Sequence, residues 1–436
     1  MTVVPYYKLS VLEKEKRTLC RKIEKQEFIM NSKEIINETI KHYQHFHNPS
    51  LARLYKFAGY NSVEWTAEGV YIRDIDGKSY IDCAGGYGVF SLGHRHPEVI
   101  EAVKEQLDKM AMSSKLFFSR PLGELCRLLA EITPGDLTFS FLCNSGAEAV
   151  EGALKIARLA TGKTQIISAI NAFHGMGVTG ETGLKKEDKP LVYIPFGDTE
   201  ALEKTINEHT AALILEPIQG EGGIIVPPDD YWPYIRKICT ERNILLIADE
   251  VQTGLGRTGK MFAVDHYGVV PDIITVAKAL GGGVIPIGAF IAKPHVWNCF
   301  KRDPLIHTST FGGSPLACIA AIKTIEILKR DRLPEKAAVT GEYLLNKLLA
   351  LKYIYPEVID SVRGKGLLIG VELTKEGIGG ALIPALVKRG VTAGYTLNKP
   401  KVIRFEPPLI ITEEEIDKVV IILEEAIKEA KKTLSI

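Results

Sequence analysis

A lysine and an aspartate, each at the end of an apolar run, are the residues of this chain best placed to do chemistry. Asp249 ends the run 244–248, and Lys278 follows the run 273–277 and precedes three glycines, 281–283. Burial lowers the pKa of a lysine and makes its amine nucleophilic, while a carboxylate can keep a pyridine nitrogen protonated. These are the two protein groups that bind pyridoxal phosphate (PLP), one holding the aldehyde covalently and one supporting the ring as an electron sink.

Both residues also have purely structural interpretations. Asp249 could cap the turn after its strand, and Lys278 could extend its amine from a strand end to water. The two runs read as neighbouring strands of an α/β sheet, and such sheets bind ligands at the carboxyl ends of their strands. The pair in this position favours a PLP site with Lys278 and Asp249 as its catalytic residues.

A second motif, Asn144-Ser145-Gly146-Ala147-Glu148, joins a strand-like run to a helical stretch. Ser145 and Glu148 predict a capping box at the start of that helix. The free N–H groups there, together with the serine hydroxyl, could bind phosphate. A plain helix cap explains the same residues.

Two further stretches could touch a cofactor. Phe173, in Phe173-His174-Gly175, could lay its ring on the cofactor's face, whereas His174 is interpreted as a structural histidine. Thr310, followed by Phe311-Gly312-Gly313, offers a hydroxyl for phosphate and fits a plain turn equally well. The pattern 254–259 is formally GxGxxG, but it lacks the amphipathic helix and the acidic residue that a dinucleotide site needs.

The composition excludes several classes of protein. The 436 residues are 46% hydrophobic and 25% charged, as in a soluble globular protein, and 54 Lys and Arg balance 53 Asp and Glu. This balance gives no reason to expect a nucleic-acid or membrane partner, and no apolar run reaches transmembrane length. The seven scattered cysteines include no CxxC pair, so we expect no metal site. With no signal-peptide pattern, they fit a reducing cytoplasm.

The order of apolar runs and helical stretches predicts an α/β fold. A helical N-terminal region, residues 8 to about 47, ends at Asn48-Pro49. From about 95 to 330, apolar runs alternate with helices, which indicates parallel strands buried on both faces. The later residues predict a smaller α/β domain that packs with the N-terminal part. The expected domains are 1–94, 95–334 and 335–436; the expected strands are 70–74, 79–82, 137–143, 164–169, 211–215, 244–248, 273–276, 287–291 and 366–373; the closing helix is 413–431.

The stretches quoted above, with Leu215-Glu216-Pro217-Ile218-Gln219-Gly220-Glu221-Gly222-Gly223, resemble in order and spacing the class III, ornithine-aminotransferase-like PLP enzymes. The resemblance runs from about residue 35 to about 430. It implies fold type I, in which a large domain with a mostly parallel seven-stranded sheet is joined by a smaller α/β domain from the N- and C-terminal parts. Within the class, the resemblance is strongest to the enzymes that transaminate putrescine, carried by the stretches 81–88, 141–146, 310–318 and 396–398.

The resemblance implies a role for each matching residue. Lys278 would hold the aldehyde, and Asp249 would pair with the ring nitrogen. Thr310 would reach the phosphate bound in the other subunit of a homodimer. The implied cofactor-binding residues are Ser145, Gly146 and Ala147 at the phosphate, Phe173 on the ring, Gln252 near the phenolic oxygen, and Thr310; the implied substrate-binding residues are Arg404 at the co-substrate's α-carboxylate, Glu221 and Tyr87.

The implied reaction moves a terminal amino group from a diamine, putrescine or cadaverine, to 2-oxoglutarate and yields an aminoaldehyde and glutamate. Putrescine has no carboxylate and 2-oxoglutarate has two, so we expect Glu221 to pair with Arg404 until a substrate carboxylate replaces it. A plain loop carboxylate is the alternative interpretation of Glu221.

Other amine donors and other classes of reaction also fit these residues. The connection from Gly175 to Pro195 is shorter than expected for putrescine aminotransferases, which leaves ornithine, acetylornithine and 4-aminobutyrate as other donors. A racemase or epimerase on the same scaffold, which needs no keto acid, and a non-catalytic binding protein are the remaining readings.

Overall fold

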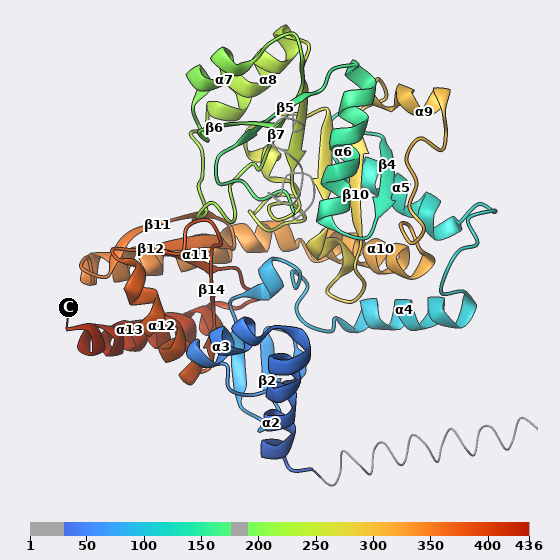
Figure 1. Cartoon of the computed structure of the whole chain (residues 1–436). Coiled ribbons are helices and arrows are strands. Elements are labelled where there is room, and N and C mark those ends of the chain that lie inside the picture. The colour runs from blue at the N-terminus through green and yellow to red at the C-terminus, as the bar shows by residue number, and fades with distance from the viewer. Residues whose placement is uncertain (1–29, 176–190, 436) are drawn as a thin grey trace, which may run out of the picture. The chain divides into compact units, whose positions relative to one another are not determined.

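A computed structural model describes residues 30–175 and 191–435 of the chain (Figure 1). These residues form two compact units, one made of residues 30–66 and 73–79 and the other of residues 67–72 and 80–435. The first half of the expected N-terminal helical region, residues 8–29, and most of the short connection after Gly175 lie outside the described residues. The expected domain boundaries remain predictions.

The smaller unit consists mainly of helices. Helix α2 (Ser32–His42) continues as the π-helix η1 (Tyr43–His47), and Asn48 then begins α3 (Pro49–Phe57). The Asn48 side chain accepts hydrogen bonds from the N–H groups of Ser50 and Leu51, and Pro49 occupies the first helical position. Asn48-Pro49 therefore ends one helix as expected and also starts another, because proline is favoured at the first turn of a helix.

The larger unit contains a seven-stranded sheet in the order β4-β10-β9-β8-β7-β5-β6. Strands β5 to β9 pair in parallel with their neighbours, whereas β10 is antiparallel to both β4 and β9. The expectation of a mostly parallel seven-stranded sheet is therefore confirmed. The strands are β4 (Phe139–Cys143), β5 (Gln165–Ala169), β6 (Leu191–Ile194), β7 (Thr210–Leu215), β8 (Leu245–Asp249), β9 (Ile273–Val276) and β10 (Gly288–Ala292).

Burial explains why most of these strands are recognisable in the sequence. Every residue of β7, β8, β9 and β10 is buried, so these strands read as continuous apolar runs. Strand β6 at the sheet edge is only partly buried, and no run identified it beforehand. The direction of β10 also differs from the parallel interpretation, because an apolar run records burial but carries no information about strand direction.

Helix α6 (Gly146–Thr161) packs against the sheet and contacts β4 and β7 to β10 (Figure 1). Its residues Val150, Leu154 and Ala157 join Phe290 of β10 in one buried apolar cluster. This cluster fixes the start of α6 against the strand ends that carry Asp249 and Lys278. The other helices of this region are α4 (Pro97–Lys109), α5 (Arg120–Ile132), α7 (Thr199–Thr205), α8 (Tyr231–Glu241), α9 (Cys299–Arg302) and α10 (Pro315–Arg330).

The C-terminal part forms a second, antiparallel sheet in the order β11-β12-β15-β14. The expected strand 366–373 begins two residues later, at Leu368, and pairs with β11. Helix α12 packs on α13, whose start at Glu413 matches the expected closing helix. The elements are α11 (Leu333–Ile354), β11 (Ile359–Lys365), β12 (Leu368–Leu373), α12 (Glu376–Lys388), β13 (Val391–Thr392), β14 (Gly394–Tyr395), β15 (Val402–Phe405) and α13 (Glu413–Leu434).

The N-terminal strands are β1 (Glu64–Glu68), β2 (Tyr71–Asp74) and β3 (Ser79–Asp82). Strands β2 and β3 match the expected ranges 70–74 and 79–82, whereas β1 was not expected. Residues Ile81 and Asp82 of β3 pair in parallel with Val391 and Thr392 of β13. Residues from both ends of the sequence therefore meet in the larger unit. Among the described residues, no helix combines the length and apolar character needed to cross a membrane.

Candidate functional site

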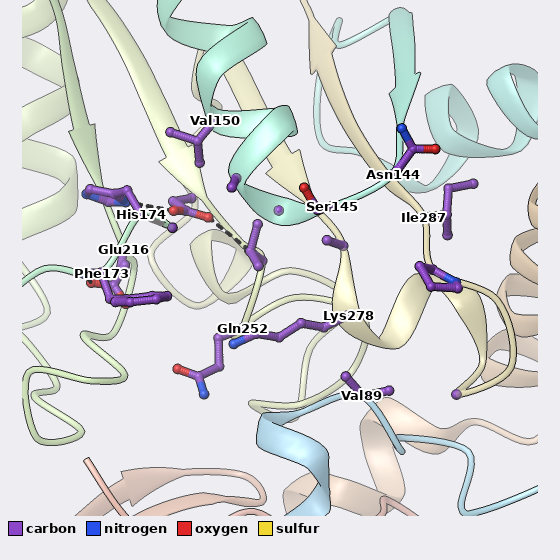
Figure 2. Close-up of a pocket in the computed structure, with 18 of the residues that line it drawn as sticks. Val89, Asn144, Ser145, Val150, Phe173, His174, Glu216, Gln252, Lys278 and Ile287 are labelled. Carbon is purple, nitrogen blue, oxygen red and sulfur yellow. Dashed lines mark hydrogen bonds and ion pairs between the residues drawn. The ribbon is translucent and has the colours of Figure 1, made fainter. Parts of the chain in front are cut away.

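A cavity of about 410 Å³ lies at the carboxyl ends of the central strands of the seven-stranded sheet (Figure 2). It is lined by residues from the β4–α6 connection, the end of β8 and the start of the 3-10 helix η5 (Lys278–Gly281). In Figure 2, Lys278 points across the cavity toward the side on which Gln252, Phe173 and Glu216 lie. Seven predicted site residues line it: Ser145, Gly146, Ala147, Phe173, Asp249, Gln252 and Lys278.

Asp249 is held in a fully hydrogen-bonded position at the end of β8. Its Oδ1 accepts hydrogen bonds from the Thr275 hydroxyl at 2.9 Å and the Val251 N–H at 3.1 Å. Its Oδ2 lies 2.7 Å from Nδ1 of His174. The side chain is almost completely buried. The carboxylate therefore has one orientation, in the wall of the cavity.

His174, which also lines the cavity, is the side chain that contacts Oδ2 of Asp249. Its Nε2 lies 3.1 Å from the Ser168 hydroxyl, so both ring nitrogens have partners. Burial acts to lower the pKa of His174, but the hydrogen bond and charge of Asp249 outweigh it, and the pKa is raised. The raised pKa favours the protonated imidazole, which places a positive charge against the Asp249 carboxylate. The interpretation of His174 as purely structural missed this contact, which joins residues far apart in the sequence.

Lys278 follows β9 and has a left-handed backbone, with φ of 45°. Such a conformation is uncommon outside glycine and is found where the surrounding structure holds it, often at functional sites. Burial lowers the pKa of the Lys278 amine, and the Arg404 charge acts in the same direction against the carboxylates of Glu406, Glu221 and Asp249. A lowered pKa leaves more of the amine unprotonated and nucleophilic.

The start of helix α6 differs from the expected capping box in one contact. The Ser145 hydroxyl accepts a hydrogen bond from the Glu148 N–H at 3.2 Å, as expected. The Glu148 carboxylate, however, binds the backbone and side-chain nitrogens of Asn144 at 3.0 and 2.9 Å. In a capping box the Glu148 carboxylate would accept a hydrogen bond from the Ser145 N–H, but here it accepts one from the Asn144 N–H instead. The first N–H groups of a helix have no partner within it, so those of Gly146 and Ala147 can bind an anion.

Glu216, which had no assigned role in the sequence, supports the aromatic wall of the cavity. Its carboxylate accepts hydrogen bonds from the N–H groups of Phe173 at 3.2 Å and Gly220 at 3.1 Å. Burial raises the pKa of Glu216 to about 7. Gly220 is needed here, because a Cβ on it would lie 1.6 Å from Oε1 of Gln252. These contacts place Phe173 and Gln252 on the same side of the cavity.

Arg404 and Glu221 form a buried ion pair, with Nη1 and Oε1 2.7 Å apart. The Tyr87 ring lies 5.0 Å from the guanidinium carbon. These three residues lie outside the cavity wall but connect with it through Glu406, which contacts both Arg404 and Gln252. The three residues expected at the substrate are therefore grouped together. Glu406, two residues after Arg404, is a fourth member of this group, and the sequence alone suggested no role for it.

Thr310 is exposed and lies outside the wall of the cavity. The turn around it is closed by a hydrogen bond from the Gly312 N–H to the Ser309 hydroxyl at 2.9 Å.

The glycine pattern 254–259 forms turns, and two of its glycines approach α11. A Cβ on Gly256 would lie within 3.2 Å of Pro334, and a Cβ on Gly259 within 3.2 Å of Ala338. Helix packing therefore explains these glycines.

The residues around the cavity fit a phosphorylated pyridine aldehyde. An amine with a lowered pKa, a carboxylate hydrogen-bonded to a histidine and a helix start with free N–H groups line one space. Among the described residues, no group of His, Cys, Asp and Glu has the arrangement of a metal site.

Comparison with known proteins gives consistent matches. The model of the family "Aminotransferase class-III" matches residues 61–427. The putrescine aminotransferase of Pectobacterium atrosepticum is 46% identical over 394 residues, covering 86% of this chain and 83% of that protein. The ornithine aminotransferase of Toxoplasma gondii, whose structure has PLP partly occupying the active site, is 31% identical with a TM-score of 0.82, covering 93% of this chain and 100% of that one. The acetylornithine aminotransferase of Elizabethkingia anophelis is 34% identical with a TM-score of 0.80, covering 92% and 100%.

Proposed function

The chain belongs to the class-III aminotransferases, and on that basis we propose that it transfers a terminal amino group from a diamine to 2-oxoglutarate. The donor is putrescine or cadaverine, and the products are an aminoaldehyde and glutamate. The observation that carries this proposal is the placement of Lys278 and Asp249 in the wall of one cavity, at the ends of adjacent strands. The similarity to the Pectobacterium putrescine aminotransferase supports the choice of a diamine.

The cofactor is PLP, and each part of it has a matching group in the chain. Lys278 would hold the aldehyde, Asp249 the ring nitrogen, and Phe173 the face of the ring. The phosphate would lie at the start of α6, against Ser145, Gly146 and Ala147, and Gln252 would lie near the phenolic oxygen. When bound, PLP supplies an electron sink beside the carbon that loses its proton.

Lys278 has two tasks in the proposed reaction. Its amine would hold the cofactor at rest, and once freed by the incoming donor amine its Nζ would accept a proton from the donor carbon. The lowered pKa of the Lys278 amine suits it to accept that proton. Asp249, oriented by its hydrogen bonds with His174 and Thr275, would present its carboxylate to the ring nitrogen in both half-reactions. The second half-reaction uses the same groups in reverse with the keto acid.

Arg404 and Glu221 allow one site to accept substrates with and without a carboxylate. While a diamine is bound, Glu221 neutralises Arg404 at 2.7 Å. When glutamate or 2-oxoglutarate binds, its α-carboxylate takes the place of Glu221. A removable partner is needed because a buried guanidinium without a counter-charge is costly. Oε2 of Glu221 accepts a second hydrogen bond, from the Leu397 N–H at 2.8 Å, which does not involve Arg404.

We further propose a homodimer in which Thr310 reaches the phosphate site of the partner subunit. The exposed position of Thr310 and the exposed apolar side chains of Leu116, Phe117 and Phe118 support this. Sedimentation of the purified protein tests the dimer, and a Thr310→Ala variant that retains PLP as tightly as the wild type would contradict the assigned contact. The expected cytoplasmic location is supported by the free thiols of the six described cysteines.

A panel of donors with 2-oxoglutarate tests the proposed substrate. Putrescine and cadaverine are expected to give higher kcat/KM than ornithine, acetylornithine and 4-aminobutyrate. The second candidate, ornithine or acetylornithine as donor, is favoured by the structural similarity to enzymes with those substrates. If ornithine gives a higher kcat/KM for glutamate formation than putrescine and cadaverine do, ornithine replaces the diamine as the proposed donor. Conversion of a chiral amino acid without any keto acid would instead indicate a racemase.

A further inference from the structure

Glu406 is a completely buried glutamate that the proposed reaction does not use. It follows β15, and the Glu406 N–H is fixed by a hydrogen bond to the Cys83 carbonyl at 2.7 Å. Its Oε2 accepts a hydrogen bond from Nε2 of Gln252 at 3.2 Å and lies 3.3 Å from Nε of Arg404. Among the residues that the structure describes, none forms a hydrogen bond with its Oε1. A buried carboxylate oxygen without a partner is unusual and requires an explanation.

The charges around Glu406 alternate in sign. Arg257 Nε lies 3.9 Å from Glu406 Oε1, Glu406 lies between Arg257 and Arg404, and Arg404 pairs with Glu221. All four side chains are buried, with at most 7% of any exposed. This group therefore carries no net charge when Glu221 is in place. When Glu221 gives way to a substrate carboxylate, Glu406 still opposes Arg404.

Glu406 also lies beside the reacting lysine. A Cβ on Gly88 would lie 2.6 Å from Glu406 Oε1 and 3.7 Å from Cδ of Lys278. The side chains of Glu406 and Lys278 therefore both lie next to the backbone of Gly88. Gly88 has φ of 95°, a left-handed conformation that favours glycine. Only glycine at this position leaves room for the carboxylate next to Lys278.

A permanent carboxylate at this point has opposite effects on the two kinds of donor. It weakens the attraction of Arg404 for a substrate carboxylate, and it makes the site more negative toward an ammonium group. Glu221 cannot have this effect, because it leaves when a carboxylate binds. Glu406 cannot leave, because it is buried between two guanidinium groups.

We propose that Glu406 determines donor specificity by biasing the site toward amines that lack a carboxylate, above all aliphatic diamines. This inference rests on the proposed function and identifies the residue that sets its substrate class. Glu406 acts through the charge that it imposes on Arg404 and on the entering amine, so it is a positioning residue.

The test compares Glu406→Gln with the wild type as holoenzymes, in single-turnover half-reactions followed by the cofactor's absorbance. Glutamine removes the charge but can keep the two contacts of Oε2, and it loses no hydrogen bond at the position of Oε1. We expect KM for glutamate to fall and kcat/KM for putrescine to fall, so that the putrescine-to-glutamate ratio of kcat/KM drops by roughly tenfold or more.

Three further variants separate charge from structure. Glu406→Asp keeps the charge, so its putrescine-to-glutamate ratio of kcat/KM should stay close to that of the wild type. Glu406→Ala removes the charge, so its ratio should fall as in Glu406→Gln. Glu424→Gln removes one negative charge far from the cavity, from a partly exposed side chain bonded to Tyr355, and should leave the ratio unchanged.

The outcomes are distinct. An unchanged ratio in Glu406→Gln, or an equal loss with both donors, would overturn the proposal. So would failure of both neutral variants to fold while Glu406→Asp folds, because the role would then be structural. A wild type that does not react with putrescine or cadaverine would contradict the proposed function instead. In that case the inference is judged on glutamate alone, whose KM must fall in Glu406→Gln.

Discussion

Replacing His174 with glutamine is expected to slow both half-reactions, because it removes an imidazole whose raised pKa favours a positive charge beside the Asp249 carboxylate. The Nδ1–Oδ2 distance is 2.7 Å, and the histidine pKa is raised by the hydrogen bond and charge of Asp249 despite burial. Glutamine has a comparable reach and can still donate one hydrogen bond, but it carries no charge. The change therefore tests the electrostatic contribution with little loss of packing.

The size of the effect follows from the kind of bond. Hydrogen bonds to charged groups contribute roughly 1.5–3 kcal/mol to stability. If this support is lost where negative charge accumulates near the ring nitrogen, the rate falls roughly ten- to hundredfold. Asp249 would serve the ring in both directions of transfer, so the rates with putrescine and with glutamate should fall by similar factors.

Single-turnover rates with each substrate, measured at saturating PLP, provide the assay. His266→Gln is the matched control, because that ring bonds the Thr258 carbonyl at 3.0 Å and is absent from the cavity wall. A His174→Gln enzyme within twofold of the wild type, beside an Asp249→Asn enzyme that is much slower, would refute the reasoning. A loss confined to one substrate would also refute it, because the contact would then act on that substrate.

The remaining predictions concern the lysine, the arginine pair and a buried carboxyl group. Lys278→Ala should show no measurable turnover, and borohydride reduction of the wild-type holoenzyme should label Lys278; labelling of another lysine would contradict the site. Glu221→Ala should slow the half-reaction with putrescine more than that with glutamate, because it leaves Arg404 with fewer counter-charges when no carboxylate binds; equal changes would rule out the exchange of partners. Burial raises the pKa of Glu250 from 4.5 to about 7, so the folded protein holds a proton that the unfolded chain releases, and stability falls as the pH rises through that window. Glu250→Gln should therefore lose less melting temperature between pH 5 and 8 than the wild type; an identical slope would contradict the raised pKa.

The sequence alone determined the class of fold and the identity of the two central residues. Strands β7, β8 and β9 are buried along their whole length, so their apolar runs mark them directly. Asp249 and Lys278 follow from those runs, because polar residues at the ends of adjacent parallel strands must meet at one edge of the sheet. The N-cap of α6 at Ser145 was predictable for a similar reason, since a cap depends on neighbours three residues away.

Only the tertiary structure decided which distant residues touch. The antiparallel direction of β10 depends on the path of the chain between strands, which an apolar run does not record. The contacts of His174 with Asp249 and of Arg257 with Glu406 join residues that are 75 or more positions apart in the sequence. Local sequence patterns report neighbours along the chain, whereas the charge balance of a buried site depends on groups brought together by folding.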